Sequence, residues 1–416
     1  MPKIIWANFL HIYQPPGWQK SIILKVAKES YRPLFKILLK NHRIKITFNI
    51  TASLTEQLIK YGLQDIVHDI KTLARSGQLE FTGSAKYHPI LSLLPENEIR
   101  RQIFLNYKTN KKYFGSFYKP VGFYPPEMAV NAKLFKLISR LGYKWIIADE
   151  ICYKGKIGQV NFNEGYKIKN TSLNIVFRNR VVSNYLYFEA DLNNPSDFWQ
   201  KVKEDNRSNQ YLITGLDGED LGHHRRGLDK LWKALISNPN VNTQTVTELL
   251  KIYRQTKIIK PLAGSWSTRE SEIRKKVPFS LWQYPDHPIH KNLWLLTFLV
   301  IKTIENSKKD KNYQETRSSL DKSIYSDPYW WASARPWWSK EIVDKGTERI
   351  LNCLYTLKNP PKKSLALAKK IYNKVTRLTN LWQRTGKAKR ISENYLKMSE
   401  DKIRYLGGRK ISATSH

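Results

Sequence analysis

The sequence predicts an α/β fold in which about seven strand–helix units build a parallel sheet and a helical region follows. Short apolar runs recur through residues 1–260, and apolar residues at helical spacing lie between them. The pattern changes near Pro261, after which helical patterns dominate. Continuous apolar strands are typical of a parallel sheet that helices cover on both faces. Seven such units approach the number that closes a barrel.

The expected strands are seven short apolar runs, at residues 3–10, 44–50, 79–82, 121–124, 145–148, 173–177 and 211–214. Between them, Ile99, Ile103 and Tyr107 recur every four residues after a proline and a glutamate, which is a common start of a helix. The same helical spacing recurs over residues 134–141. Strands and helices therefore alternate along the first part of the chain.

The second part of the chain is predicted to be helical. Residues 289–304 are nearly all apolar, which predicts a buried helix. Two further helices are expected at about 338–357 and 362–382, since an Asn-Pro-Pro sequence separates them. The expected division is a barrel, a helical region and a basic, flexible tail, at residues 1–260, 261–385 and 386–416.

The chain carries 71 Lys and Arg against 35 Asp and Glu, which is a formal net charge of +36. An excess of this size favours anionic partners such as nucleic acid. The positive charge is spread along the chain, however, and no nucleic-acid-binding motif accompanies it. We therefore expect no specific nucleic-acid partner, and we interpret the dense positive charge of the tail as a solvated helical face.

Cysteine content and hydropathy restrict the compartment. The two cysteines, Cys152 and Cys353, form no disulfide framework and have no zinc-ligand spacing. The apolar run at the N-terminus is shorter than that of a signal peptide, and the apolar run 293–301 is too short to span a bilayer. These features predict a cytoplasmic protein without a membrane partner, and they leave the oligomeric state unknown.

Polar and acidic residues follow five of the expected strands, at the point where each strand ends. Because the carboxyl ends of parallel strands meet at one face of a barrel, these side chains can converge there. They are His11, Gln14, His88, Glu127, Asp149, Glu150, Asp217, Glu219, Asp220, His223 and His224.

Glu127 follows an apolar strand and two prolines, which fix the backbone directly before it. A rigid carboxylate at the end of a strand suits a nucleophile, because the attacking oxygen must meet its target within a narrow geometry. The alternative is an acid at the N-terminus of the helix at 130–141, where negative charge is favourable. Position alone does not choose between the two.

Asp217 begins an acidic cluster, because Glu219 and Asp220 lie within the next three residues. Carboxylates so close together raise the pKa of at least one of them. A raised pKa lets a general acid keep its proton near neutral pH. A helix cap is an alternative for Asp220, whereas the spacing does not fit a calcium loop.

His11, His88 and His223 have more than one chemical use. Neutral imidazole and carboxylate are common metal ligands. The same rings can hydrogen-bond hydroxyl groups without a metal, or be buried for structural reasons. Likewise, Trp266 and the Trp-rich segment 330–338 can form flat stacking surfaces or fill a core.

Five short blocks, taken in order, resemble glycoside hydrolase family 57. They are His11-Ile12-Tyr13-Gln14-Pro15, His88-Pro89, Tyr124 three positions before Glu127, Asp217-Gly218-Glu219-Asp220-Leu221-Gly222, and Asp327-Pro328-Tyr329-Trp330. Tyr13 stands where the first block of the family has a second histidine. The segment 265–294 is also similar to members of the family, so the resemblance spans about residues 3–345.

This resemblance implies an incomplete (β/α)₇ barrel followed by a helical region that completes the active site. It implies a retaining hydrolase or transferase of α-linked oligo- or polysaccharides, with Glu127 as nucleophile, Asp217 as acid/base, and no metal or other cofactor. The implied substrate-binding residues are His11, Gln14, His88, Tyr124, Glu219, His223, Asp327 and Trp330.

Two other functions remain open at this point. The first is a metal-dependent carbohydrate-active enzyme of deacetylase or mannosidase type, which would use His11, His88 and Asp217. The second is a basic protein that binds glycans or nucleic acid without catalysis. The two carboxylic acids expected of a glycosidase, Glu127 and Asp217, argue against the second.

Overall fold

The structure is a computed structural model that describes residues 4–205, 211–253 and 256–397. The chain forms two compact units, Met1–Arg274 and Lys275–His416, and each is described by itself. The first boundary predicted from the sequence, after residue 260, falls earlier than this division. Of the predicted tail, 387–397 is helical, and 398–416 lies outside the described residues.

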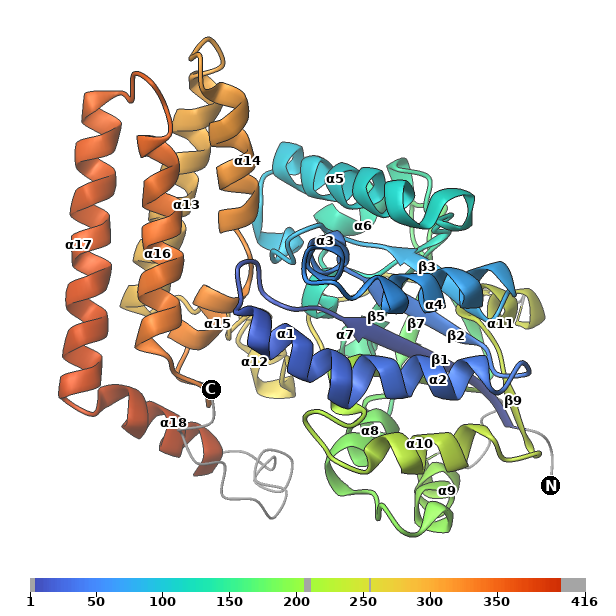
Figure 1. The fold of residues 1–416 in the computed structure, drawn as a ribbon. Helices are drawn as coiled ribbons and strands as arrows, with labels where there is room; N and C mark the ends of the chain where they lie inside the picture. Colours follow the sequence, from blue (N-terminus) through green and yellow to red (C-terminus); the bar gives the residue numbers. More distant parts are fainter. Residues whose placement is uncertain (1–3, 206–210, 254–255, 398–416) are drawn as a thin grey trace. The chain divides into compact units, whose positions relative to one another are not determined.

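The first unit is built on one sheet whose central strands are parallel, in the order β8-β1-β2-β3-β4-β5-β7 (Figure 1). These seven are the strands that the sequence predicts. Short strands β6, β9 and β10 flank them; β10 is exposed along most of its length and gave no apolar signal. The bounds are β1 Ile4–Ile12, β2 Ile46–Ile50, β3 Leu79–Gly83, β4 Gly122–Phe123, β5 Trp145–Asp149, β6 Gly165–Ile168, β7 Asn174–Arg178, β8 Tyr211–Asp217, β9 Val241–Thr243 and β10 Thr256–Ile259.

Helices wrap the outside of this sheet, with α3, α4 and α5 along one side and α8, α9 and α10 along the other (Figure 1). The helices predicted after Pro95 and at 130–141 are confirmed as α5 and α6. The bounds are α1 Lys20–Val26, α2 Arg32–Leu39, α3 Ala52–Lys60, α4 Gln64–Arg75, α5 Glu96–Phe114, α6 Ala132–Arg140, α7 Ile151–Lys154, α8 Arg180–Asn184, α9 Pro195–Asp205, α10 Leu228–Ile236, α11 Val246–Ile252 and α12 Glu270–Arg274.

Alternate residues of each strand face the helices or the barrel interior. In β1, Trp6, Leu10 and Ile12 belong to the buried core that the helices share with the sheet. Phe9 and His11 lie on the opposite face of the strand, where their rings contact the ring of Tyr124. The barrel interior can therefore carry polar residues while the helix-facing side remains apolar.

The barrel is open between β7 and β8, which are not hydrogen-bonded neighbours in the sheet order. The Asn179 backbone N–H donates to the Ile213 carbonyl at 2.8 Å. Two residues further along β8, the Gly215 N–H donates to Ser183 Oγ at 3.2 Å and its carbonyl accepts from Arg178 Nε at 2.9 Å. Side chains thus satisfy backbone groups that an eighth strand would otherwise pair. The predicted incomplete (β/α)₇ barrel is confirmed.

The second unit is helical, as predicted, and the expected helices at 289–304, 338–357 and 362–382 are confirmed as α13, α16 and α17. Helix α13 packs against both α16 and α17. Among the described helices, none is long and apolar enough to cross a membrane. The bounds are α13 Pro288–Asn306, α14 Tyr313–Ser323, α15 Asp327–Ala332, α16 Lys340–Tyr355, α17 Lys362–Arg384 and α18 Lys387–Lys397.

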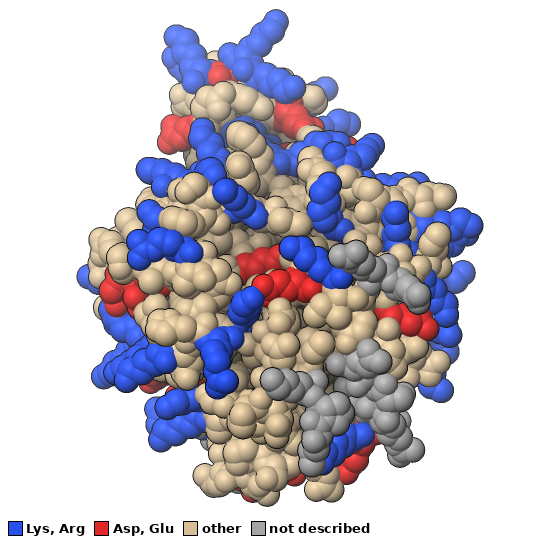
Figure 2. All heavy atoms as spheres, turned by 90° about the vertical axis from the view of Figure 1, so that its right-hand side faces the viewer, with Lys and Arg blue, Asp and Glu red and all other residues tan. Residues whose placement is uncertain are grey.

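Positive charge is spread over the face drawn in Figure 2 and forms no single patch there. Lys and Arg side chains are scattered over that face, and Asp and Glu side chains form smaller groups between them (Figure 2). This distribution agrees with the even spread of charge along the sequence. The absence of a specific nucleic-acid partner stays a prediction.

Gly122 of β4, the strand before Glu127, packs closely against the ring of Trp145 in β5. A Cβ atom on Gly122 would lie 2.0 Å from Cε2 of Trp145, which is buried in the neighbouring strand β5. We expect Gly122→Ala to lower the free energy of unfolding by about 2–3 kcal/mol, because the ring must leave its packed position. Urea denaturation measures this loss. Val121→Ala, at an exposed neighbour, is the control and changes stability by about 0.5 kcal/mol or less.

Candidate functional site

The register of the sheet places polar residues of three strands side by side at their carboxyl ends. His11 of β1 pairs with Asn49 of β2 on one side and with Asp217 of β8 on the other. Their side chains share the barrel-facing side of the sheet, because the intervening residues face the helices. The sequence pointed to His11 and Asp217. It did not point to Asn49, which lies inside an apolar run.

His11 is held as a neutral hydrogen-bond acceptor. Its Nδ1 lies 2.8 Å from the Asn49 side-chain oxygen, while the Asn49 amide nitrogen donates to Thr82 Oγ1 at 2.9 Å. Because Asn49 presents its oxygen, Nδ1 carries the ring proton and Nε2 is the acceptor. Burial lowers the pKa of His11 to about 3, and Nε2 has no protein partner among the described residues. The ring therefore carries a buried acceptor that no described protein group uses.

Aromatic rings stack beside His11. The ring centroids of His11 and His88 are 5.0 Å apart, and those of Tyr13 and His88 are 4.1 Å apart, with both pairs nearly parallel. The centroid of the Tyr124 ring lies 4.6 Å from that of His11. Burial, together with His11, lowers the pKa of His88 well below its usual value, so this imidazole is neutral too. Three of the predicted substrate-binding residues therefore form one wall.

Tyr124 lies close to both candidate catalytic acids. Burial, and next the charges of Asp217 and Glu127, raise the pKa of Tyr124 well above its usual value. Both carboxyl groups therefore act on the same phenol, although the two residues are 90 positions apart in the sequence. The fold thus brings the predicted nucleophile and the predicted acid/base to one place.

Glu127 is held in a strained turn by Trp266. It lies in the 3₁₀ turn Pro126–Met128 after β4, with a φ of 60°, which is unfavourable for any residue other than glycine. The Trp266 backbone N–H donates to the Glu127 carbonyl at 3.2 Å, and the indole Nε1 donates to the carboxyl Oε2 at 2.8 Å. The other oxygen, Oε1, lies 3.9 Å from His88 Nδ1. The carboxyl group therefore has a fixed orientation.

The alternative that Glu127 caps the following helix does not hold. Asn131 is the N-cap of α6, and its side-chain oxygen accepts from the Leu134 N–H at 2.9 Å. The Glu127 side chain is instead directed to Trp266 and keeps about one fifth of its surface exposed, 20%. A ligand can reach it.

Asp217 ends β8 in surroundings that favour its protonated form. Burial raises its pKa well above the usual value, and the charges of Asp220, Glu219 and Glu127 raise it further. The guanidinium of Arg178 acts in the opposite direction. The acidic cluster recognised in the sequence therefore has the expected effect, and Asp217 is the group in it that is suited to donate a proton.

Glu219 and Gln14 contact each other. The buried Glu219 carboxyl accepts hydrogen bonds from Gln14 Nε2 at 3.2 Å, from the Tyr13 backbone N–H at 3.1 Å and from the Tyr31 hydroxyl. Burial raises the pKa of Glu219. Both residues were predicted to bind substrate. Their bonds link the loop after β1 to the turn after β8, so they position the loops around His11 and Asp217.

His223 contacts Glu29, whose Oε2 lies 2.6 Å from His223 Nδ1, while burial lowers the pKa of the imidazole. This bond, more than any other factor, lowers the pKa of Glu29. His224 contacts Asp220 at 3.1 Å in the same loop. Glu29 gave no sequence signal, because it lies 194 residues from its partner in a helical stretch.

Asp327 and Trp330 belong to the second unit, where they lie in helix α15. The Trp330 ring packs edge-on against Trp331 at 5.6 Å and against Trp337 at 6.5 Å. Their predicted part in substrate binding stays a prediction.

The metal-dependent alternative required His11, His88 and Asp217 to converge as ligands. Within the described ranges, no group of three or more His, Cys, Asp or Glu side chains is placed to hold a metal ion. The His11 nitrogen Nδ1 is also committed to Asn49.

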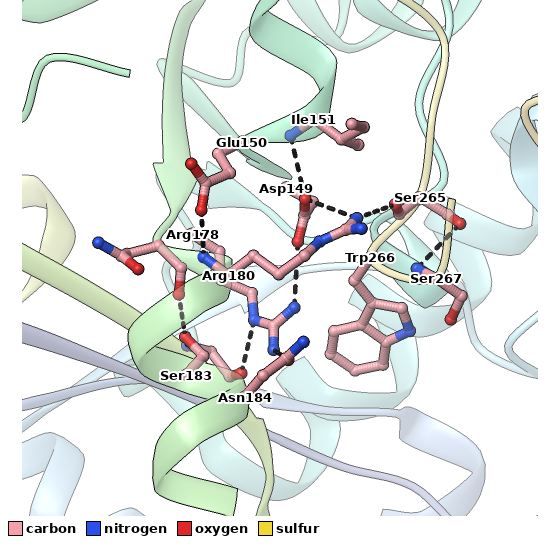
Figure 3. A network of polar contacts seen from close by, with 12 residues as sticks. Asp149, Glu150, Ile151, Arg178, Arg180, Ser183, Asn184, Ser265, Trp266 and Ser267 are labelled. Carbon is pink, nitrogen blue, oxygen red and sulfur yellow. Dashed lines mark hydrogen bonds and ion pairs between the residues drawn. The ribbon is translucent and has the colours of Figure 1, made fainter. Parts of the chain in front are cut away.

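Sequence reasoning missed a buried charge network around Asp149 (Figure 3). Asp149, at the end of β5, contacts Arg178 Nη1 at 3.0 Å and Arg180 Nη2 at 2.7 Å. Asp149 and Glu150 were noted as acids at the end of a strand, whereas the two arginines were not. Two arginines directly after an apolar strand were the available signal, because an arginine there must find a buried acid.

The family model of glycosyl hydrolase family 57 matches residues 7–261. An α-amylase of Pyrococcus horikoshii is 23% identical over 282 residues, which are 65% of this chain and 44% of the amylase. The chain spans less than half the length of the curated relatives it matches.

Solved structures show the same fold. A 4-α-glucanotransferase from Thermococcus litoralis superposes with a TM-score of 0.67 at 17% identity, over 86% of this chain and 60% of that one. A branching enzyme from Thermococcus kodakaraensis superposes with a TM-score of 0.63 at 15% identity, over 90% of this chain and 95% of that one. Both support the open barrel followed by helices.

The left-handed backbone of Glu127 predicts that its replacement by glycine is more stable than its replacement by alanine. Both variants lose the bond from Trp266, so their difference isolates the backbone. We expect Glu127→Gly to exceed Glu127→Ala by about 1 kcal/mol in the free energy of unfolding. The matched pair Lys136→Gly and Lys136→Ala, in helix α6, should show the opposite order by a similar amount. Equal stability of the two Glu127 variants contradicts the strain.

The raised pKa of Asp217 predicts a pH-dependent gain from Asp217→Asn. Above about pH 4 the unfolded chain ionises this group while the folded chain resists ionisation, so ionisation favours unfolding. Asparagine removes this effect. We therefore expect a higher free energy of unfolding for the variant at pH 7, and the gain should disappear as the pH falls below about 4. Urea denaturation at pH 7 and pH 3.5 tests this, and a gain that persists at pH 3.5 contradicts it.

Proposed function

Because the chain belongs to glycosyl hydrolase family 57, we propose that it cleaves α-linked glucans by a retaining double displacement, with Glu127 as nucleophile and Asp217 as acid/base. The observation that carries this proposal is that two carboxyl groups near Tyr124, whose charges both raise the pKa of that phenol, lie in contrasting surroundings. One is oriented by the Trp266 indole, and the other is surrounded by negative charge.

In the first step, Asp217 donates its proton to the glycosidic oxygen as the bond to the anomeric carbon breaks. A Glu127 oxygen attacks that carbon, which leaves a glycosyl group esterified to Glu127 and a sugar with a new hydroxyl. The bond from Trp266 to Oε2 orients the carboxyl group for this attack. The neutral His88 beside Oε1 adds no positive charge that would weaken the nucleophile.

In the second step, Asp217 removes a proton from the acceptor, and the acceptor oxygen displaces Glu127. Water as acceptor completes hydrolysis, and a sugar hydroxyl completes transfer. The relatives include an α-amylase and a 4-α-glucanotransferase, which by their names represent the two outcomes. Substrate binding is assigned to His11, which accepts a sugar hydroxyl at Nε2, and to the rings of His88 and Tyr124. We also assign Asp327 and Trp330 to substrate binding.

Incubation with maltoheptaose tests the proposal. Wild-type protein should release shorter maltooligosaccharides, with the α configuration retained in the first product detected by proton NMR. Glu127→Ala should lower kcat by about 10³-fold or more, because the covalent step is lost. Asp217→Asn should lower kcat by about 10²–10⁴-fold. Chromatography separates hydrolysis, with shorter products only, from transfer, with shorter and longer products together.

Glu96→Ala is the matched control, because this exposed glutamate bonds Arg100 and Arg140 and contacts neither candidate acid. Its turnover should equal that of the wild type. Turnover that survives in Glu127→Ala, or a first product of β configuration, contradicts the assigned mechanism.

A further inference from the structure

Asp149 lies at the centre of a buried network of polar contacts with Arg178 and Arg180 (Figure 3). Its side chain is fully buried; Oδ2 contacts Arg178 and Oδ1 contacts Arg180. Oδ1 also accepts from the Ile151 N–H at 3.0 Å. One carboxylate therefore holds two guanidinium groups, which make different further hydrogen bonds.

The Arg178 branch leads to Asp217 and crosses the open side of the barrel. Arg178 Nε donates to the carbonyl of Gly215, two residues before Asp217 in β8, and Nη2 donates to Asn184 Oδ1 at 2.6 Å. A Cβ atom on Gly215 would lie 3.2 Å from Arg178 Cδ, so the glycine permits the close approach. Arg178 thus holds the strand end that carries Asp217.

The Arg180 branch leads to Glu127 through Trp266. Arg180 Nη1 donates to the Thr268 carbonyl at 2.6 Å, and Nη2 donates to the Ser265 carbonyl at 3.1 Å. These two carbonyls flank Trp266 in the chain, and Trp266 bonds both the backbone and the carboxyl of Glu127. Arg180 thus holds the loop that orients Glu127.

Glu150 holds the backbone of Arg180, from which the second branch begins. It is buried beside Asp149 and accepts from the Arg180 N–H at 2.7 Å and from the Gly158 N–H at 2.8 Å. Burial, and then the charge of Asp149, raise its pKa to about 7. Buried ion pairs add little net stability, because desolvation offsets the attraction between the charges. The main effect of this network is therefore to fix the positions of the backbone segments that Arg178 and Arg180 bond.

We propose that Asp149, Arg178 and Arg180 are positioning residues that set the relative placement of Glu127 and Asp217, with Arg178 acting on Asp217 and Arg180 acting on Glu127. The inference rests on the proposed function for its catalytic meaning. Its structural part, the link from Arg180 through Trp266 to Glu127, can be measured without turnover.

The Trp266 indole signal tests the Arg180 branch in the full chain. Protein labelled with nitrogen-15 at the tryptophan indoles is recorded across pH, and Trp266→Phe identifies the Trp266 signal. In the wild type this signal should move with the protonation of Glu127, its acceptor. Arg180→Lys keeps the charge beside Asp149 but cannot bridge two carbonyls. We expect the signal to shift toward that of a water-exposed indole and kcat to fall about tenfold, with KM within about twofold.

Arg317→Lys is the control, since Arg317 forms a buried pair with Asp321 in the second unit at 3.0 Å. It should leave the Trp266 signal and kcat unchanged. An unchanged Trp266 signal in Arg180→Lys overturns the proposal, whether or not the protein turns over glucan. If wild-type protein is inactive on glucan but the signal shifts, the proposed function fails and the positioning link stands.

The pH profile tests the Arg178 branch. Removal of its charge in Arg178→Gln should move the alkaline limb of kcat/KM upward by about one pH unit, because Asp217 then holds its proton more tightly. Arg178→Lys keeps the charge and should restore the limb, but its kcat should fall, because lysine does not reproduce the guanidinium bonds to both the Gly215 carbonyl and Asn184. The other titratable groups acting with Asp217 are Glu127, Glu219, Asp220, Tyr31, Tyr124 and Tyr187. These groups are unchanged in both variants. If the alkaline limb of kcat/KM in Arg178→Gln stays at the pH of the wild type, the proposed role of Arg178 is overturned. If Arg178→Gln does not fold, Arg178→Lys with an unaltered kcat overturns it.

Discussion

The open side of the barrel is the constraint on which the site depends. Seven parallel strands leave β8 with backbone groups that no strand pairs, and buried groups of this kind require partners. Arg178 and Ser183 bond the Gly215 carbonyl and N–H, respectively. A guanidinium buried for this purpose requires a counter-charge, and Asp149 supplies it. The completion of the sheet and the placement of Asp217 therefore come from the same bonds.

The sequence predicted the elements that have a clear local pattern of apolar residues. The seven central strands are continuous apolar runs, and α5, α6, α13, α16 and α17 carry apolar residues at helical spacing, so local pattern was sufficient. The residues at the strand ends followed from the rule that parallel strands end together. Strand β10 was missed because three of its four residues are exposed.

What the sequence could not predict depends on contacts between distant segments. The left-handed backbone of Glu127 is stabilised by Trp266, 139 residues away, and the sequence around Glu127 contains no sign of it. The Glu29–His223 pair and the link from Arg180 to the Ser265 carbonyl also join remote segments. Only the tertiary structure specifies which buried charge meets which partner, so a single sequence shows the charges but not the pairs.

Several features at this site reduce stability, and their common location is informative. Glu127 occupies a strained backbone conformation, Asp217 is buried among like charges, and the His11 acceptor has no protein partner among the described residues. All three residues lie near Tyr124. The His11 ring contacts the Tyr124 ring, and the charges of Asp217 and Glu127 raise the Tyr124 pKa. Strain of this kind persists only where the surroundings over-determine it, and the Asp149 network does so here. A fold selected for stability alone would have relaxed these positions, so their concentration at the ends of β1, β4 and β8 supports the proposed catalytic site.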